Sequence, residues 1–215
     1  MKSPQYNGYE YGNATLNPSH GYLLPKLDNI FNELGVYGSS RRLFDLGCGN
    51  GSISAYLASK GLRVTGVDPS TDGIREAQKS YPNIKLEEGS AYDDLAGKYG
   101  RFPLVVSLEI VEHVYSPREY ASTLFNLLEP GGVAIVSTPY HGYLKNLALA
   151  ITGKMDAHFT ALWDHGHIKF WSIDTLSQLL MEAGFSELSF CRVGRLPPLA
   201  KSMIAIAHKP VDEAN

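Results

Sequence analysis

The 215-residue sequence has little cysteine, no long apolar run and no excess of basic residues. Its two cysteines, Cys48 and Cys191, do not suggest a disulfide scaffold, so a reducing, cytoplasmic compartment is the simpler interpretation. No stretch approaches about 18 uninterrupted apolar residues, and no apolar signal-peptide region is visible, so we expect no membrane span. With 19 Lys and Arg against 22 Asp and Glu, the net charge of −3 makes a nucleic-acid partner unlikely in electrostatic terms.

Short apolar strands alternate with helices from Arg42 onward. Strands are predicted at 43–46, 63–67, 84–87, 103–107 and 132–137, and helices at 52–60, 71–81, 116–129 and 172–184. Two further apolar runs, 188–193 and 202–208, can pair as an antiparallel edge. The pattern predicts one domain over 1–215, of α/β class, with a Rossmann-like, doubly wound, mostly parallel seven-stranded sheet and an antiparallel C-terminal strand pair.

Two segments stand outside this alternation. Residues 1–40 are expected to form an N-terminal arm rich in tyrosine, followed by a helix from about Ser19 to Gly35. Residues 140–166 interrupt the sequence after the fifth strand, where substrate-contacting loops of such sheets lie. We expect this insertion to be a substrate-side lid.

A glycine-rich turn follows the first strand: Asp45-Leu46-Gly47-Cys48-Gly49-Asn50-Gly51. Glycines at such a turn let the backbone approach a ligand closely. The dinucleotide fingerprint has its third glycine one place later, where this chain has Ser52. A carboxylate at Asp45 suits a ligand that carries an amine and repels a pyrophosphate, which favours S-adenosylmethionine over a dinucleotide. Asp68 ends the second strand, where a carboxylate can accept hydrogen bonds from ribose hydroxyls; the alternative is that it only caps the next helix.

Residues 43–54 followed by 64–70 resemble the first two signature blocks of class I S-adenosylmethionine-dependent methyltransferases, and the resemblance extends from about Arg42 to Lys209. It implies that the glycine loop borders the methionine portion of the cofactor and that Asp68 holds the ribose. It also implies that the segment after the third strand flanks the adenine and that the end of the fourth strand lies beside the methyl-bearing sulfur. The predicted cofactor-binding residues are Asp45, Gly47, Cys48, Gly49, Gly51, Asp68, Pro69, Ser90, Ala91, Tyr92, Ser107, Leu108 and Glu109.

Glu109-Ile110-Val111-Glu112-His113 places two carboxylates and an imidazole after the fourth strand. If the segment is helical, all three lie on one face. They could then bind a divalent cation, Mg²⁺ or Mn²⁺, with His165 or His167 as a fourth ligand. A metal-free role of His113 as general base, and a purely structural role, stay open.

Within the methyltransferases, Glu-x-x-Glu-His followed later by His-x-x-x-Lys-Phe resembles the O-methyltransferases of ubiquinone biosynthesis. The terminal 2′-O-methyltransferases of small RNAs also carry Glu-x-x-Glu-His as a metal site, but the absence of a basic run weighs against RNA. The chain departs from the quinone enzymes in its tyrosine-rich N-terminus and its His-Gly-His, so the quinone substrate is not transferred to it.

These patterns predict an S-adenosylmethionine-dependent methyltransferase acting on an oxygen of a small, hydrophobic or aromatic molecule. His113 with Glu109 and Glu112 is the expected catalytic set, and His20, Tyr140 and His141 are expected to contact the acceptor. The alternatives are an RNA 2′-O-methyltransferase, a non-catalytic S-adenosylmethionine-binding protein and a nicotinamide oxidoreductase. The apolar run 143–151 of the insertion could pack on the domain or touch a membrane surface, although its single lysine, Lys145, supports the latter poorly. No pattern predicts an oligomeric state.

Overall fold

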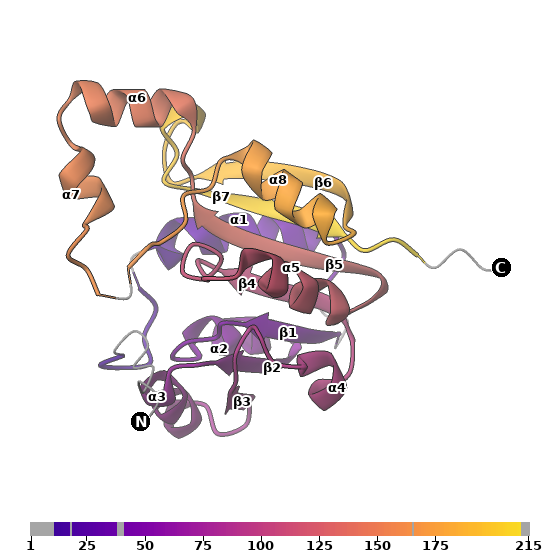
Figure 1. Ribbon diagram of the computed structural model, residues 1–215. Coiled ribbons are helices and arrows are strands. Elements are labelled where there is room, and N and C mark those ends of the chain that lie inside the picture. Colours follow the sequence, from indigo (N-terminus) through magenta and orange to yellow (C-terminus); the bar gives the residue numbers. More distant parts are fainter. Residues whose placement is uncertain (1–10, 18, 38–40, 165, 212–215) are drawn as a thin grey trace, which may run out of the picture.

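A seven-stranded sheet in the order β3-β2-β1-β4-β5-β7-β6 forms the centre of the computed structural model, which describes residues 11–17, 19–37, 41–164 and 166–211 (Figure 1). The strands are β1 (Arg42–Leu46), β2 (Arg63–Asp68), β3 (Lys85–Glu88), β4 (Phe102–Leu108), β5 (Leu128–Pro139), β6 (Ser186–Val193) and β7 (Ser202–His208). Strands β1 to β5 pair in parallel, whereas β7 pairs antiparallel with both β5 and β6. The predicted fold class is confirmed.

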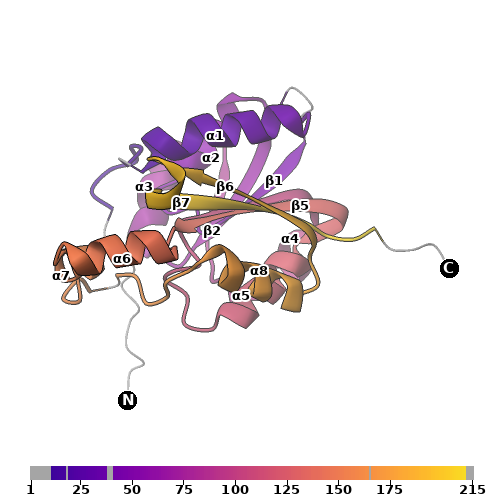
Figure 2. The ribbon, with the colours of Figure 1, turned by 90° about the horizontal axis from the view of Figure 1, so that it is seen from above.

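Helices cover both faces of the sheet (Figure 2). They are α1 (His20–Glu33), α2 (Ser52–Ser59), α3 (Thr71–Ser80), α4 (Leu95–Tyr99), α5 (Pro117–Asn126), α6 (Tyr143–Ile151), α7 (Met155–Phe159) and α8 (Ile173–Glu182), with a short 3₁₀ turn η1 (Pro197–Leu199). One face carries α1, α2 and α3, and the other carries α4, α5 and α8. Leu27 and Phe31 of α1 are fully buried on the first face, and Tyr120 and Leu180 of α5 and α8 on the second.

Local sequence signals explain several helix boundaries. Ser172 caps α8 in a reciprocal capping box with Thr175, and Ser70 caps α3 by accepting the Gly73 N–H. Ser116 precedes α5 as predicted, but its side chain makes no capping hydrogen bond, and Pro117 alone marks the start. Helix α5 ends earlier and β5 begins earlier than expected, because the strand continues back through the Pro-Gly-Gly segment to Leu128.

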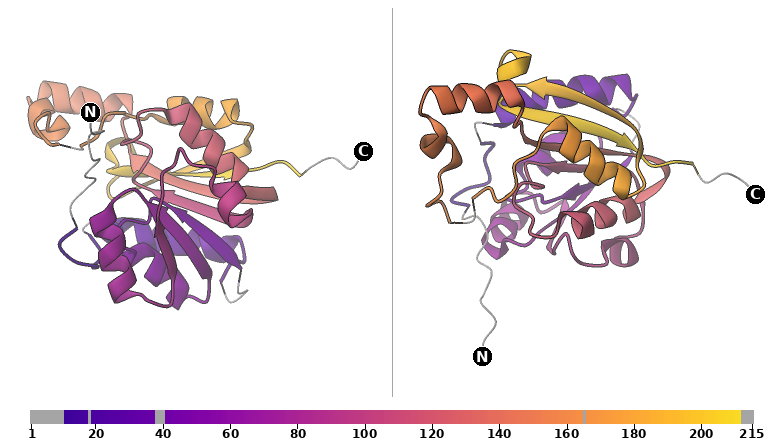
Figure 3. Two further views of the ribbon diagram at one scale, coloured as in Figure 1. Left: turned by 60° about the horizontal axis from the view of Figure 1, so that its bottom comes forward. Right: turned by 45° about the horizontal axis from the view of Figure 1, so that its top comes forward.

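The insertion after β5 contains α6 and α7, which project from the body of the domain (Figures 1 and 3). Because α6 follows β5 directly, both helices lie at the carboxyl edge of the parallel strands. Strand order reverses between β1 and β4, and in open sheets of this kind the ligand crevice lies at this edge, beside that switch.

Candidate functional site at the carboxyl edge of the sheet

The turn between β1 and α2 is closely packed. Gly51, the residue before α2, has φ of 74°, and a Cβ there would lie 2.7 Å from Cδ1 of Leu86 and 2.9 Å from Cβ of Ala77. Only glycine meets both requirements. The amides of Gly47 and Cys48 donate to the Val67 carbonyl, at 2.8 and 3.0 Å, which fixes the turn against β2.

A cavity of about 360 Å³ opens beside this turn. Its wall is formed by the ends of β1 and β4, the glycine turn, the start of α2, the N-terminal arm and the start of α1. The lining residues are Tyr11, Gly12, Asn13, Thr15, Leu16, Asn17, His20, Asp45, Gly47, Cys48, Gly49, Asn50, Ser52, Ile53, Leu108, Glu109 and Ile110. Its volume falls in the usual range for small-molecule sites.

Hydrogen bonds hold the arm over the glycine turn. The side-chain amide of Asn50 donates to the carbonyls of Asn13 and Thr15, at 2.8 and 3.0 Å, and the Tyr81 hydroxyl donates to the Ala14 carbonyl at 2.6 Å. No pattern in the sequence indicated that Asn50, inside the glycine motif, anchors the arm.

Asp45 is a buried carboxylate at the cavity wall, with 2% of its surface exposed. Its Oδ2 accepts a hydrogen bond from the Ser54 hydroxyl at 2.6 Å. Burial raises the pKa of Asp45 to about 7, with a smaller contribution from Asp68 and an opposing one from Ser54. A cationic ligand group would therefore find a carboxylate that is half ionised near neutral pH.

Asp68 holds the glycine turn from the neighbouring strand. Its Oδ2 accepts the Gly49 N–H at 2.9 Å and its Oδ1 accepts the Ser70 N–H at 2.8 Å. Burial raises the pKa of this carboxyl group as well. The cap of α3 is Ser70, so Asp68 does not merely cap that helix.

The other predicted cofactor residues lie at different depths along this edge. Pro69 is exposed, and Ser90, Ala91 and Tyr92 form the turn after β3, outside the cavity lining. The Tyr92 hydroxyl accepts the Ser116 N–H at 3.1 Å. Ser107 is fully buried and donates to the Leu46 carbonyl at 2.8 Å, so its hydroxyl joins β4 to β1 rather than facing the cavity.

Residues 109–113 form a turn and not a helix, so the three side chains do not share a helical face. Glu109 has φ of 57°, which redirects the chain directly after β4. Its two carboxylate oxygens accept hydrogen bonds from Ser137 at 2.8 Å and from Ser202 at 3.2 Å. Glu109 therefore faces β5 and β7, and burial raises its pKa.

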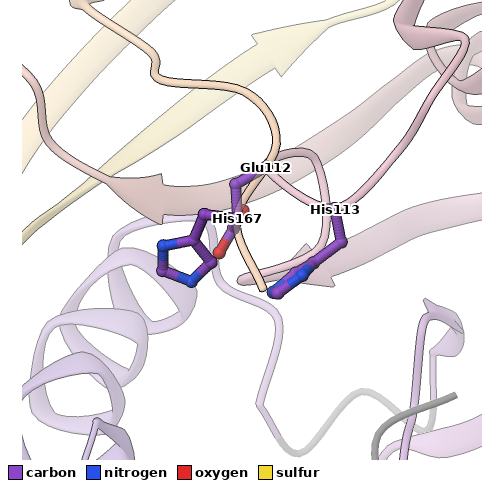
Figure 4. A group of neighbouring side chains, drawn as sticks. All are labelled: Glu112, His113 and His167. Atoms are coloured by element: carbon purple, nitrogen blue, oxygen red, sulfur yellow. The ribbon is translucent and has the colours of Figure 1, made fainter. Parts of the chain in front are cut away.

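Glu112, His113 and His167 come together instead, with ligand atoms within 4.8 Å of one another (Figure 4). Glu112 is almost completely buried; its Oε2 accepts the Thr138 hydroxyl at 2.9 Å, while its Oε1 has no partner among the described residues. Burial raises the pKa of Glu112, and Glu109 raises it further. His165, the other predicted ligand, lies outside the described residues.

Backbone contacts bring these two distant segments together. The amides of Ile168 and Lys169 donate to the Glu112 carbonyl, at 2.9 and 3.0 Å. Nδ1 of His113 lies 3.2 Å from the Gly166 carbonyl, the kind of contact that orients metal-binding histidines. Burial lowers the pKa of His167 to about 4, so it is a neutral ring at neutral pH.

The three predicted acceptor-contacting residues separate into two places. His20, at the start of α1, lines the cavity, and burial lowers its pKa to about 4. Tyr140 and His141 follow β5 and are both buried, at 9% and 7% exposure. Lys145 of α6 lies beside them, and its ammonium donates to the Tyr140 carbonyl at 2.7 Å. Sequence patterns did not single out Lys145, although a lone lysine within an apolar helical run was a visible signal.

The match to known proteins agrees with this geometry. Residues 21–189 match a family model described as a methyltransferase domain. The chain belongs to the methyltransferase-domain family. It is similar to proteins named ubiquinone biosynthesis O-methyltransferase, with 31% identity to the one from Psychrobacter arcticus (72% of this chain, 62% of the relative) and 40% to one from a Caulobacter species (57% and 48%). The chain thus spans about half to three fifths of the length of these curated relatives.

Solved structures show the same fold. A methyltransferase from Methanosarcina mazei, described as SAM-dependent, superimposes with a TM-score of 0.62 at 21% identity, covering 84% of this chain and 98% of that one. Magnesium protoporphyrin IX methyltransferase from Synechocystis, solved with bound SAH, gives 0.62 at 22% identity, covering 86% and 82%. At such identities the likeness establishes the fold alone. None of the helices in the described part of the chain is long and apolar enough to cross a membrane.

Proposed function

We propose that the protein transfers a methyl group from S-adenosylmethionine to an oxygen of a small molecule. The observation that carries this proposal is the cavity beside the glycine turn, which has the buried Asp45 carboxylate in its wall and continues along β4 to Glu109 and Ile110. A cofactor with an ammonium at one end and a reactive methyl group near its middle suits this arrangement. The family membership and the names of the relatives support it.

In this proposal the chain binds and aligns the reactants. The bound cofactor supplies an electrophilic methyl group, so the protein mainly orients the acceptor oxygen and excludes water. Asp45 would hold the ammonium and Asp68 the ribose hydroxyls, while Leu108 and Glu109 would form the wall near the methyl group. Pro69, Ser90, Ala91 and Tyr92 would lie toward the adenine.

The acceptor hydroxyl would meet Glu112, His113 and His167. The unpartnered buried Oε1 of Glu112, next to two imidazoles, fits a divalent cation such as Mg²⁺ or Mn²⁺. A cation bound there would lower the pKa of an acceptor hydroxyl. In the alternative without a cation, His113 would instead receive the acceptor proton as a general base. Glu109, already bonded to Ser137 and Ser202, would shape the site without binding the cation.

Calorimetric titration with S-adenosylhomocysteine tests the cofactor site. We expect binding to the wild type and loss of most of this binding in Asp68→Ala. Asp174→Ala, which removes an acidic side chain from the distant helix α8, should leave the affinity unchanged. Absence of binding to the folded wild type would refute the proposal.

The cation is tested by titrating chelator-treated protein with Mn²⁺ and following the electron paramagnetic resonance of free Mn²⁺. Glu112→Gln should weaken binding strongly because it removes the anionic ligand. Glu109→Gln should change it little if the ligand set is the one given above. An equal loss of Mn²⁺ affinity in both variants would show that Glu109 is also a ligand of the cation. Absence of Mn²⁺ binding by the wild type would exclude the cation site.

The proposal also includes contact of α6 with a lipid surface. The helix turns its apolar side chains outward: Tyr143 and Ile151 are 79% and 76% exposed, and Leu144 is 56% exposed. Of the two alternatives for this run, packing of the apolar face on the domain is the one that these exposed side chains contradict. We expect wild-type protein to cosediment with phospholipid vesicles and Leu144→Ser with Ile151→Ser to stay in the supernatant. Met181→Ser, an exposed apolar change on α8, is the matched control.

A further inference from the structure

Helix α6 has an unusual distribution of side chains. Lys145 is its only buried residue, with 8% exposure, while the apolar side chains around it face outward. Lysine is seldom buried unless the surroundings compensate the charge. The inward position of this ammonium therefore requires a physical reason.

The partners of Lys145 within the chain satisfy only part of its hydrogen-bonding capacity. Its Nζ donates to the carbonyls of Tyr140 at 2.7 Å and Lys201 at 3.3 Å. An ammonium has three donors, so one is left over for a further acceptor. No carboxylate of the described residues lies within 4.0 Å of this nitrogen.

Lys145 and Arg195 bring two positive charges to this region, against the one carboxyl group of Glu109. Burial and, to a smaller extent, Arg195 lower the pKa of Lys145 to about 8, whereas Glu109 opposes the change. Lys145 and Arg195 in turn help to lower the pKa of His158, after burial. Glu109, whose carboxyl group acts on Lys145, already accepts hydrogen bonds from two serines. The region has an excess of donors and positive charge that an anion would balance.

A second buried polar group lies nearby. His141 is 7% exposed; its Nδ1 and the Oδ1 of Asn146 each lack a hydrogen bond of normal geometry among the residues described, and the Asn146 side chain opposes the lowering of the His141 pKa by burial. Its ring lies 5.8 Å from that of Phe159, stacked, and 5.0 Å from that of Phe170, edge-on, with His158 at 5.4 Å. Phe159 and Phe170 contact each other at 4.8 Å. An aromatic surface thus adjoins the imidazole of His141.

We propose that His141, Lys145, His158, Phe159 and Phe170, together called the His141 cluster, bind a carboxylate of the methyl acceptor and the aromatic ring that carries it. Lys145 and His141 donate to the carboxylate, and Phe159 and Phe170 lie against the ring. The cluster adjoins Glu109, which lines the cofactor cavity, so the acceptor would extend from the cluster toward the cofactor. This inference rests on the proposed methyl transfer and narrows its substrate class to aromatic hydroxy acids.

A matched pair of probes isolates the charge. Vicinal dihydroxybenzoate and dihydroxybenzamide share the ring and both hydroxyls, and only the first carries an anion at neutral pH. Calorimetry on protein saturated with S-adenosylhomocysteine should show the carboxylate binding at least about tenfold more tightly than the amide, the size expected for one charged hydrogen bond.

Three variants assign the preference to the cluster. Lys145→Met should reduce the carboxylate-to-amide ratio to about twofold or less while affinity for S-adenosylhomocysteine is kept. His141→Phe should lower the ratio as well, because it preserves the ring and removes the donor. Lys154→Met, an exposed lysine between α6 and α7, should retain the wild-type ratio. A purely structural role of Lys145 would weaken both probes equally.

The result that overturns the inference is a wild type that binds S-adenosylhomocysteine yet binds both probes equally or neither. A preference unchanged in Lys145→Met overturns it too. Should Lys145→Met fail to fold, the carboxylate-to-amide affinity ratio of the wild type and its change in His141→Phe still test the inference. Failure of the wild type to bind S-adenosylhomocysteine refutes the methyl-transfer proposal instead, so the two failures are distinct.

Discussion

Replacing Asp45 by Asn removes a charge from the cavity wall and preserves the shape of the side chain. The folded chain holds this carboxyl group almost out of contact with water, and burial raises its pKa from 3.8 to about 7. Each pH unit between these values corresponds to about 1.4 kcal/mol. Ionised Asp45 therefore destabilises the ligand-free chain by about 4 kcal/mol relative to its unfolded state, once the pH exceeds both values.

The sign of the pH dependence follows from the raised value. The stability associated with protonated Asp45 is fully present below about pH 4 and is lost as the pH rises to about 7. Asp45→Asn has no such loss, so the ligand-free variant should be more stable than the ligand-free wild type at about pH 8. Its gain is reduced by the weakened hydrogen bond to Ser54, about 1 kcal/mol.

The affinity for the ligand should rise with pH, whereas the stability of the ligand-free protein should fall. If the ammonium of S-adenosylhomocysteine requires ionised Asp45, wild-type affinity should rise about tenfold between about pH 6 and pH 8. The variant should bind more weakly and show little of this rise. Glu109 also lines the cavity and has a raised pKa, so the comparison of wild type with variant is decisive.

Calorimetry at both pH values measures the affinity, and urea unfolding at the same values measures the stability. Wild-type affinity that does not vary with pH, or the same pH dependence in Asp45→Asn, would refute the assignment of the ammonium to Asp45. A variant less stable than the wild type at about pH 8 would refute the destabilisation derived from its burial.

Three further variants test the surroundings of the cavity. Gly51→Ala combines a left-handed backbone with a Cβ closer than 3.0 Å to two apolar carbon atoms, so urea unfolding should show a loss of about 2–4 kcal/mol. Asn50→Ala removes the hydrogen bonds to the carbonyls of Asn13 and Thr15; limited proteolysis should then cut the arm faster, with affinity for S-adenosylhomocysteine reduced about threefold to thirtyfold. Ser172→Ala disrupts the capping box of α8 and should cost about 1 kcal/mol in unfolding with no change in that affinity. An unchanged proteolysis rate in Asn50→Ala would contradict these assignments. So would a loss of affinity in Ser172→Ala as large as that in Asn50→Ala.

The parallel part of the fold was predictable because its signals are local. Short apolar strands, the glycine turn and the Ser172 cap each depend on a few neighbouring residues. The antiparallel pairing of 202–208 was predictable from its position after the last helix. The short helix α4 was missed because its five residues carry no helical period.

The arrangement at the site depended on contacts that no local pattern reports. A helix over 109–113 would have joined Glu109 to Glu112 and His113, but the left-handed backbone at Glu109 turns its side chain toward two serines from β5 and β7. His167 joins Glu112 because backbone amides far along the chain bond to the Glu112 carbonyl. The sequence narrowed the candidate ligands, and tertiary contacts selected among them.

Two buried lysines, Lys209 and Lys145, differ in the role that their surroundings indicate. Lys209 donates to the carbonyls of Phe125 and Leu128, at 3.0 and 2.9 Å, and its ammonium also lies 4.3 Å from the centre of the Phe125 ring. It ties the end of β7 to α5 and β5, away from the carboxyl edge, and a neutral replacement there should lower stability without changing probe selectivity.

Lys145 donates to two carbonyls as well, but its ammonium keeps a third donor and the positive charge of Arg195 acts on it. Asp45 and Glu112, two buried carboxylates at the same edge, lack a cationic side chain within 4.0 Å in the described chain. Burying such groups is unfavourable unless opposite charge is supplied. Their gathering at the carboxyl edge therefore indicates that ligands supply it: an ammonium at Asp45, a cation at Glu112 and a carboxylate at Lys145. Each of these ligands should raise the melting temperature of the wild type, and each shift should vanish in the variant that removes its own partner.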